Sequence, residues 1–151
     1  MISLRLVMEK YISKYYLDQP FSYNGDVTPI RSWKVGIKSH PLYVVNPNSI
    51  NEVCLIGIEP NVIIKMCKKS KDRIIEFERN IKSSLSLFQS KNGYIFCKNE
   101  NNIEIIYSLE FVITGHNEVE HIDGDPLNHL FTNLKIHKYI DVPSKKNEMS
   151  F

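Results

Sequence analysis

The chain has 151 residues, of which 42% are hydrophobic and 24% are charged, and its formal net charge is +2. This balance is typical of a soluble globular protein that can bury a usable core. No run is long enough to span a membrane, and the N-terminal stretch lacks the uninterrupted apolar core of a signal peptide. The small net charge neither requires nor excludes a nucleic-acid partner, because binding would need only a local basic patch.

The three cysteines are Cys54, Cys67 and Cys97. Their odd number and wide spacing indicate neither a disulfide framework nor a Cys-x-x-Cys zinc site. They are therefore interpreted as reduced thiols, mostly buried, in a cytoplasmic protein. Frequent Ile, Lys and Asn hint at an AT-rich genome such as many phages have.

The N-terminal segment is predicted to be an amphipathic helix that ends near Asp18-Gln19-Pro20. Its apolar residues recur at steps of three and four, which is the spacing of one helix face: Leu4, Val7, Met8, Tyr11, Ile12 and Tyr15. Asn24-Gly25-Asp26 then indicates a turn. From Trp33 to Met66 the pattern becomes extended, and Asn46-Pro47-Asn48 and Glu59-Pro60-Asn61 separate short strands with tight connections.

A second helix is predicted to begin near Ser70, whose side chain could cap it, with Asp72 in its first turn. Asn92-Gly93 would end this helix. Its expected apolar stripe consists of Ile74, Phe77, Ile81, Leu85 and Phe88.

A hairpin is predicted to follow. Tyr94–Cys97 would be its first strand, Asn99–Asn102 its turn and Ile103–Ile113 its return strand. Thr114-Gly115-His116-Asn117 then links the hairpin to the segment that carries most of the chemistry.

That segment runs from Val119 to Asn128 and is closed by Asn133-Leu134-Lys135-Ile136. It is predicted to form two short strands around a loop, with a polar cluster at the mouth of the loop. His121 can transfer a proton near neutral pH, and Glu120 beside it can hold a hard cation. Asp123 and Asp125 are interpreted as turn residues, because they flank a glycine, precede a proline and lack the spacing of a calcium loop.

The combination of acid-His-Ile-Asp-Gly, then Leu-Asn, then Asn-Leu resembles the HNH endonucleases, in particular their phage and homing-type branch. The resemblance covers about residues 91–151. It implies a ββα-metal fold that hydrolyses phosphodiester bonds with a divalent cation, expected to be Mg²⁺, with Mn²⁺ or Ni²⁺ as alternatives. The expected fold class is therefore α+β, with this motif following an N-terminal helix, short strands and a second helix.

The family's functional residues map onto particular positions of this chain. By resemblance, His121 is the general base, Asn133 orients it by tying the strands together, and Glu120 is a metal ligand. The remaining ligand of the family would be Asn147, on a short helix that begins near Val142-Pro143 after an insertion around His137–Ile140. In relatives the return strand of the hairpin often carries His-Arg, where this chain has Leu109-Glu110.

Basic residues near the expected site are candidate DNA contacts. Those at the C-terminal side are Lys135, Lys138, Lys145 and Lys146, and a second cluster includes Lys68 and Lys69. A charged, solvated turn before a helix is the competing interpretation of the second cluster. A separate structural zinc site is not favoured, because the spacing of His116, His121, His129 and His137 fits no helical pair and no cysteine joins them.

Two functions follow from these features. The first is a metal-dependent DNA endonuclease or nickase of the HNH type, phage-encoded and acting in the host cytoplasm. The second is an HNH-derived nucleic-acid-binding or structural protein that no longer cleaves, since a fold does not determine a function. In both, residues 1–90 form an N-terminal region that could contact the target or a protein partner. The boundary near residue 90 divides either two domains, 1–90 and 91–151, or two layers of one fold.

Overall fold

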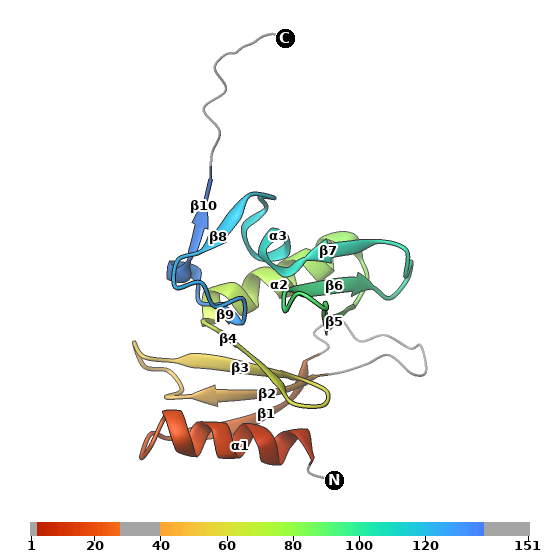
Figure 1. Cartoon of the computed structure of the whole chain (residues 1–151). Helices are drawn as coiled ribbons and strands as arrows, with labels where there is room; N and C mark the ends of the chain where they lie inside the picture. The colour runs from red at the N-terminus through yellow and green to blue at the C-terminus, as the bar shows by residue number, and fades with distance from the viewer. Residues whose placement is uncertain (1–2, 28–39, 138–151) are drawn as a thin grey trace, which may run out of the picture.

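The computed structural model describes residues 3–27 and 40–137. Within these residues the chain forms three α-helices, one short 3-10 helix and three β-sheets, which confirms the predicted α+β class (Figure 1). No helix in this part of the chain is both long and apolar enough to cross a membrane. The predicted final helix, with Asn147, lies outside the described residues.

The largest sheet has five strands, in the order β1-β2-β3-β4-β9. The first four pair as antiparallel neighbours, whereas β9 joins the edge parallel to β4. The short β9 therefore attaches the C-terminal segment directly to the N-terminal sheet. The strands are β1 (Phe21–Val27), β2 (His40–Val45), β3 (Val53–Ile58), β4 (Val62–Met66) and β9 (Asn128–His129).

Helix α1 (Leu4–Tyr15) covers one face of this sheet, as Figure 1 shows, and confirms the predicted N-terminal helix. Ser3 caps it, because its side chain accepts a hydrogen bond from the Leu6 backbone N–H at 3.2 Å. One stripe of α1 is buried against the sheet, so burial of an apolar face stabilises the helix. The stripe and its partners are Leu4, Met8, Ile12, Tyr43, Val45, Leu55 and Ile63.

Side chains of α1 pack tightly against Gly57 in β3. A Cβ atom at this position would lie 2.7 Å from Met8 Sδ and 3.0 Å from Leu4 Cδ2. We expect Gly57→Ala to lower the free energy of unfolding by about 1–2 kcal/mol, because the buried Met8 and Leu4 side chains must shift to accommodate the methyl group. Urea denaturation measures this change. Ile50→Ala, at a side chain that is 98% exposed, is the control, and equal stability of the two variants would contradict the tight packing.

The opposite face of the sheet supports the main core. Helices α2 (Lys68–Ile81) and α3 (Leu109–Thr114) pack there with a three-stranded sheet of β5 (Leu85–Gln89), β6 (Ile95–Asn99) and β7 (Ile106–Ser108). Residues from both sides of position 90 share this core, among them Ile56, Ile64, Ile74, Leu87, Cys97 and Ile113.

Helix α2 differs from its prediction at both ends. It begins at Lys68 after Cys67, so Ser70 lies inside the helix instead of capping it. It ends at Ile81, and Lys82 adopts a left-handed conformation with φ of 54°. Leu85 and Phe88, which were assigned to the helical stripe, belong to strand β5, which pairs with β6.

The hairpin is confirmed in part. β6 and β7 pair as antiparallel strands, but β7 is only three residues long. Ser108 then caps α3 by accepting a hydrogen bond from the Phe111 N–H at 3.1 Å. Of the predicted return strand Ile103–Ile113, only Ile106–Ser108 is a strand; residues 103–105 belong to the connection before it and residues 109–113 to α3. As a result Glu110 lies on a helix beside the segment that carries His121.

Candidate functional site

The segment singled out in the sequence forms two strands around a loop. β8 (Val119–His121) pairs with β10 (Leu134–Ile136) as an antiparallel ladder, and His121 lies opposite Leu134. In the loop, Asp123 Oδ1 accepts from the Asp125 N–H and Asp125 Oδ1 accepts from the Leu127 N–H, both at 2.9 Å. The two aspartates therefore serve the backbone of the turn.

Asn133, in the 3-10 helix Phe131–Asn133, ties the loop together. Its Nδ2 donates to the Asn128 carbonyl oxygen at 2.9 Å and to Asp123 Oδ1 at 3.0 Å. Its Oδ1 accepts from the Asp123 backbone N–H at 3.0 Å. This buried amide therefore uses both ends to hold the loop against the start of β10.

Both ring nitrogens of His121 have partners. Nδ1 lies 2.9 Å from the Asn128 carbonyl oxygen, and Nε2 lies 2.8 Å from Glu110 Oε2. Because a carbonyl oxygen can only accept, Nδ1 must carry a proton. Nε2 is therefore the nitrogen whose protonation can change, and it points at the Glu110 carboxylate.

His129 completes a three-residue cluster with Glu110 and His121. Its Nε2 lies 3.0 Å from the same Glu110 oxygen, and its ring meets that of His121 edge to face with centroids 4.7 Å apart. The His129 side chain is fully buried, and its Nδ1 has no hydrogen-bond partner among the described residues. Ser70 of α2 fixes the backbone here by donating to the His129 carbonyl oxygen at 2.7 Å.

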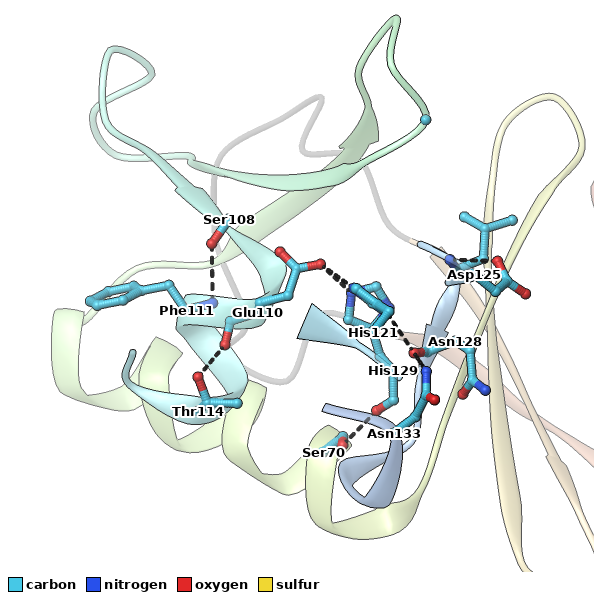
Figure 2. Close-up of polar contacts among 12 residues, drawn as sticks. Ser70, Ser108, Glu110, Phe111, Thr114, His121, Asp125, Asn128, His129 and Asn133 are labelled. Carbon is cyan, nitrogen blue, oxygen red and sulfur yellow. Dashed lines mark hydrogen bonds and ion pairs between the residues drawn. The ribbon is translucent and has the colours of Figure 1, made fainter. Parts of the chain in front are cut away.

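Figure 2 shows how different elements bring this cluster together. Glu110 reaches across from α3, and its carboxylate points toward the overlapping rings of His121 on β8 and His129 on β9. Thr114 stabilises the supporting turn of α3 by donating to the Glu110 carbonyl oxygen at 2.8 Å. The three side chains thus converge from separate parts of the fold.

The electrostatics of the cluster follow from burial and from these hydrogen bonds. Burial alone would raise the pKa of the Glu110 carboxyl, but the hydrogen bonds from His121 and His129 outweigh it and lower this pKa to about 2. Burial alone would lower the pKa of His121, yet the Glu110 carboxylate and the Asn128 carbonyl raise it above its ordinary value. With the Glu110 carboxyl ionised, a proton on His121 Nε2 completes an ion pair between the two side chains.

The cluster could hold a metal ion. One oxygen of Glu110 and one ring nitrogen of each histidine lie within 4.8 Å of one another. The Nδ1–H of His121, bonded to a backbone carbonyl, leaves Nε2 as the nitrogen that can offer a lone pair, which is the usual support of a metal-bound histidine. Ligand atoms around a tetrahedral zinc ion are about 3.3 Å apart, so the present separations of 2.8 and 3.0 Å would need only a small expansion.

Glu120, the ligand expected from the sequence, does not belong to this cluster. Its Oε1 lies 2.7 Å from His137 Nε2 in an exposed pair. Glu120 and His121 nevertheless line one cavity of about 390 Å³, together with Tyr94, Gly124 and Pro126. The other expected ligand, Asn147, lies outside the described residues.

Of the six lysines predicted to contact DNA, three can be located. Lys135 lies on β10 opposite Glu120, on the exposed side of the ladder. Lys69 Nζ lies 4.0 Å from the centre of the Phe131 ring, which places the start of α2 beside the loop, whereas Lys68 is paired with Asp72 at 3.0 Å. Lys138, Lys145 and Lys146 lie outside the described residues.

Glu110 and His129 are the site residues that the sequence did not reveal. His129 was considered only as part of a zinc pattern that fits no helical pair, and Glu110 was placed on a strand. The sequence does contain one signal, because Ser108 followed by Glu110 before an apolar run is typical of a helix start. Nothing local indicates that this acid faces two histidines further along the chain.

Comparison with protein-family models, with curated proteins and with solved structures gives no match for this chain.

Proposed function

We propose that this protein is a metal-dependent nuclease of the HNH type that hydrolyses phosphodiester bonds in DNA. The observation that carries the proposal is the arrangement around His121, at the end of a two-stranded unit. The ring is oriented by a loop carbonyl, the loop is tied by Asn133, and a carboxylate and a second histidine lie within ligand distance. An adjoining cavity lined by Glu120 and His121 offers room for a substrate group.

The role proposed for His121 follows from its contacts. A general base needs a ring nitrogen with a free lone pair. Here Nδ1 donates to a carbonyl, so only Nε2 can offer a lone pair, and Nε2 lies beside the Glu110 oxygen that His129 also contacts. We therefore assign His121 as a metal ligand together with Glu110 and His129, and the ion would take the place of the proton on Nε2. A divalent ion at this position would supply a bound water of lowered pKa and neutralise charge on the phosphate.

The ligand set also bears on the choice of ion. Mg²⁺, the first choice from the family resemblance, prefers oxygen ligands and retains water, whereas imidazole suits Zn²⁺ and Ni²⁺. With two histidines and one carboxylate, the proposed ion is Zn²⁺ or Ni²⁺, with Mn²⁺ weaker. Lys135 and Lys69 would contact the DNA backbone on either side of the loop.

The metal proposal predicts the behaviour of purified, chelator-treated protein. Calorimetric titration with Zn²⁺ or Ni²⁺ is expected to show one bound ion per chain, and His129→Ala should weaken binding at least about tenfold. His137→Ala is the matched control, because that histidine pairs with Glu120 and lies outside the cluster. Equal affinity of the two variants would place the ion elsewhere.

Cleavage is tested with supercoiled plasmid and the same ions. Nicking or linearisation is expected with the wild-type chain and not with His121→Ala or His129→Ala. Activity that persists in both variants would refute the proposed centre.

The second candidate is a non-cleaving DNA-binding protein derived from the same fold. One observation favours it. Without an ion, Glu110 already accepts from two histidines, so these buried polar groups form hydrogen bonds with one another and can stabilise the fold without a metal. Protein that binds DNA but neither takes up an ion nor cleaves would support this candidate.

A further inference from the structure

A second cavity, of about 420 Å³, lies between α1, β4 and the loop after β8. Its volume is in the range of small-ligand sites. Two tyrosines of α1, Tyr11 and Tyr15, line it with rings 4.6 Å apart. Leu127 adds an apolar surface to the cavity, and its polar lining residues are Asn61 from the turn before β4, Lys65 of β4 and Asp125 of the loop.

Part of the aromatic surface at this cavity is exposed to solvent. The Tyr15 side chain is 58% exposed, although Tyr11 packs against it. Lys14 Nζ lies 5.2 Å from the centre of the Tyr15 ring and adds a positive charge beside it. An exposed aromatic ring next to a lysine is the combination on which nucleic-acid bases stack while their phosphates are neutralised.

The polar part of the cavity suits the edge of a base. An amide such as Asn61 both donates and accepts, and a carboxylate such as Asp125 accepts from exocyclic amino groups. Lys65 is placed to contact a phosphate. An unpaired base offers a flat face to the tyrosines and hydrogen-bonding groups to Asn61 and Asp125, whereas an aliphatic side chain offers neither.

Backbone hydrogen bonds connect the cavity to the segment that carries the proposed reaction site. The Lys65 N–H donates to the Leu127 carbonyl oxygen at 2.9 Å, and Lys65 lies opposite Asn128 in the β4–β9 ladder. Alternate residues of one loop face the two cavities, with Gly124 and Pro126 lining the one next to His121 and Asp125 and Leu127 lining this one. The loop after β8 therefore lies between this cavity and the one lined by His121.

We propose that the cavity between Tyr11, Tyr15 and Asp125 is a subsite for one unpaired base of a nucleic-acid strand. This inference rests on the proposed function and sharpens it, because it makes the preferred substrate single-stranded or locally unpaired DNA. Tyr15 supplies the stacking surface, and Asn61 and Asp125 contact the base edge. Lys65 holds the adjoining phosphate.

Binding is tested by fluorescence anisotropy with the full chain in EDTA, so that neither metal nor cleavage is needed. The probes are a labelled single-stranded oligonucleotide, a fully paired duplex and the same duplex with one bulged base. The single strand and the bulged duplex are expected to bind at least about fivefold more tightly than the paired duplex. Tyr15→Leu should weaken their binding by about five- to tenfold, whereas Tyr15→Phe, which keeps the ring, should stay within about twofold.

A photo-crosslink locates the base. An oligonucleotide with one 5-iodouracil is expected to crosslink to the peptide that contains Tyr11 and Tyr15. Equal binding of all three probes, an unchanged affinity of Tyr15→Leu, or a crosslink elsewhere would overturn the subsite. Selective binding without cleavage in any metal would leave the subsite standing and refute the nuclease, so the two failures are distinguishable.

Discussion

Replacing Glu110 by alanine is expected to lower the free energy of unfolding by about 3–5 kcal/mol in metal-free buffer at pH 7. Its carboxylate is the shared acceptor for His121 and His129, at 2.8 and 3.0 Å. The Glu110 pKa of about 2 keeps this group charged at pH 7. Removing it leaves the Nε2 atoms of His121, whose side chain is only 7% exposed, and of the fully buried His129 without their shared hydrogen-bond partner. Urea denaturation followed by circular dichroism measures the loss.

Two comparisons separate this effect from a general loss of packing. Glu118→Ala changes an exposed acid between α3 and β8, and it should leave stability within about 0.5 kcal/mol of wild type. Combining Glu110→Gln with His121→Gln should cost less than the sum of the single changes, since each alone leaves the other without its partner. Additive costs would show that the pair does not stabilise the fold.

The helix α2 and strand β5 show why local patterns could be misread. Ile74, Phe77 and Ile81 recur at helical spacing, and Leu85 and Phe88 continue the same steps by coincidence. In the structure Leu85 and Leu87 pack in the main core from strand β5, and Ser86 between them is buried as well, so burial does not alternate along this strand. The helical spacing of Leu85 and Phe88 therefore does not exclude a strand, and pairing with β6 decides between helix and strand.

Local sequence patterns also predict only part of the candidate site. The strand–loop–strand unit and the turn roles of Asp123 and Asp125 could be predicted, because each depends on the turn chemistry of the segment itself. The partner of His121 could not, because it depends on where α3 packs. Glu110 lies eleven residues away on a helix that had been assigned to a strand, and His129 is held by pairing of β9 with β4 and by Ser70. Tertiary packing, not local sequence, completes the cluster.

Glu78 is expected to make the protein less stable as the pH rises from 5 to 9. It is 1% exposed near the end of α2, where Oε2 accepts from the Leu85 N–H at 2.7 Å and Oε1 has no hydrogen-bond partner among the described residues. Burial raises the pKa of this carboxyl from 4.5 to about 7, although the Leu85 N–H partly offsets the shift.

The sign of the effect follows from this raised pKa. Between pH 4.5 and 7 the folded state binds more protons than the unfolded state, so the free energy of unfolding falls as the pH rises through this range. The loss between pH 5 and pH 9 should reach about 2–3 kcal/mol and be nearly complete above pH 8.

Glu78→Gln removes this charge while keeping a carbonyl oxygen for the Leu85 N–H. Relative to wild type, the variant should gain about 2–3 kcal/mol in stability between pH 5 and pH 9, measured by urea unfolding at several pH values. Glu76→Gln, at an exposed position on the same helix, should show no such trend and corrects for other titrating groups. If the difference between wild type and Glu78→Gln is constant with pH, burial does not raise the pKa of this carboxyl in the folded protein. If it grows as expected, a proton held by Glu78 stabilises the junction between α2 and β5, independently of any ion bound at Glu110.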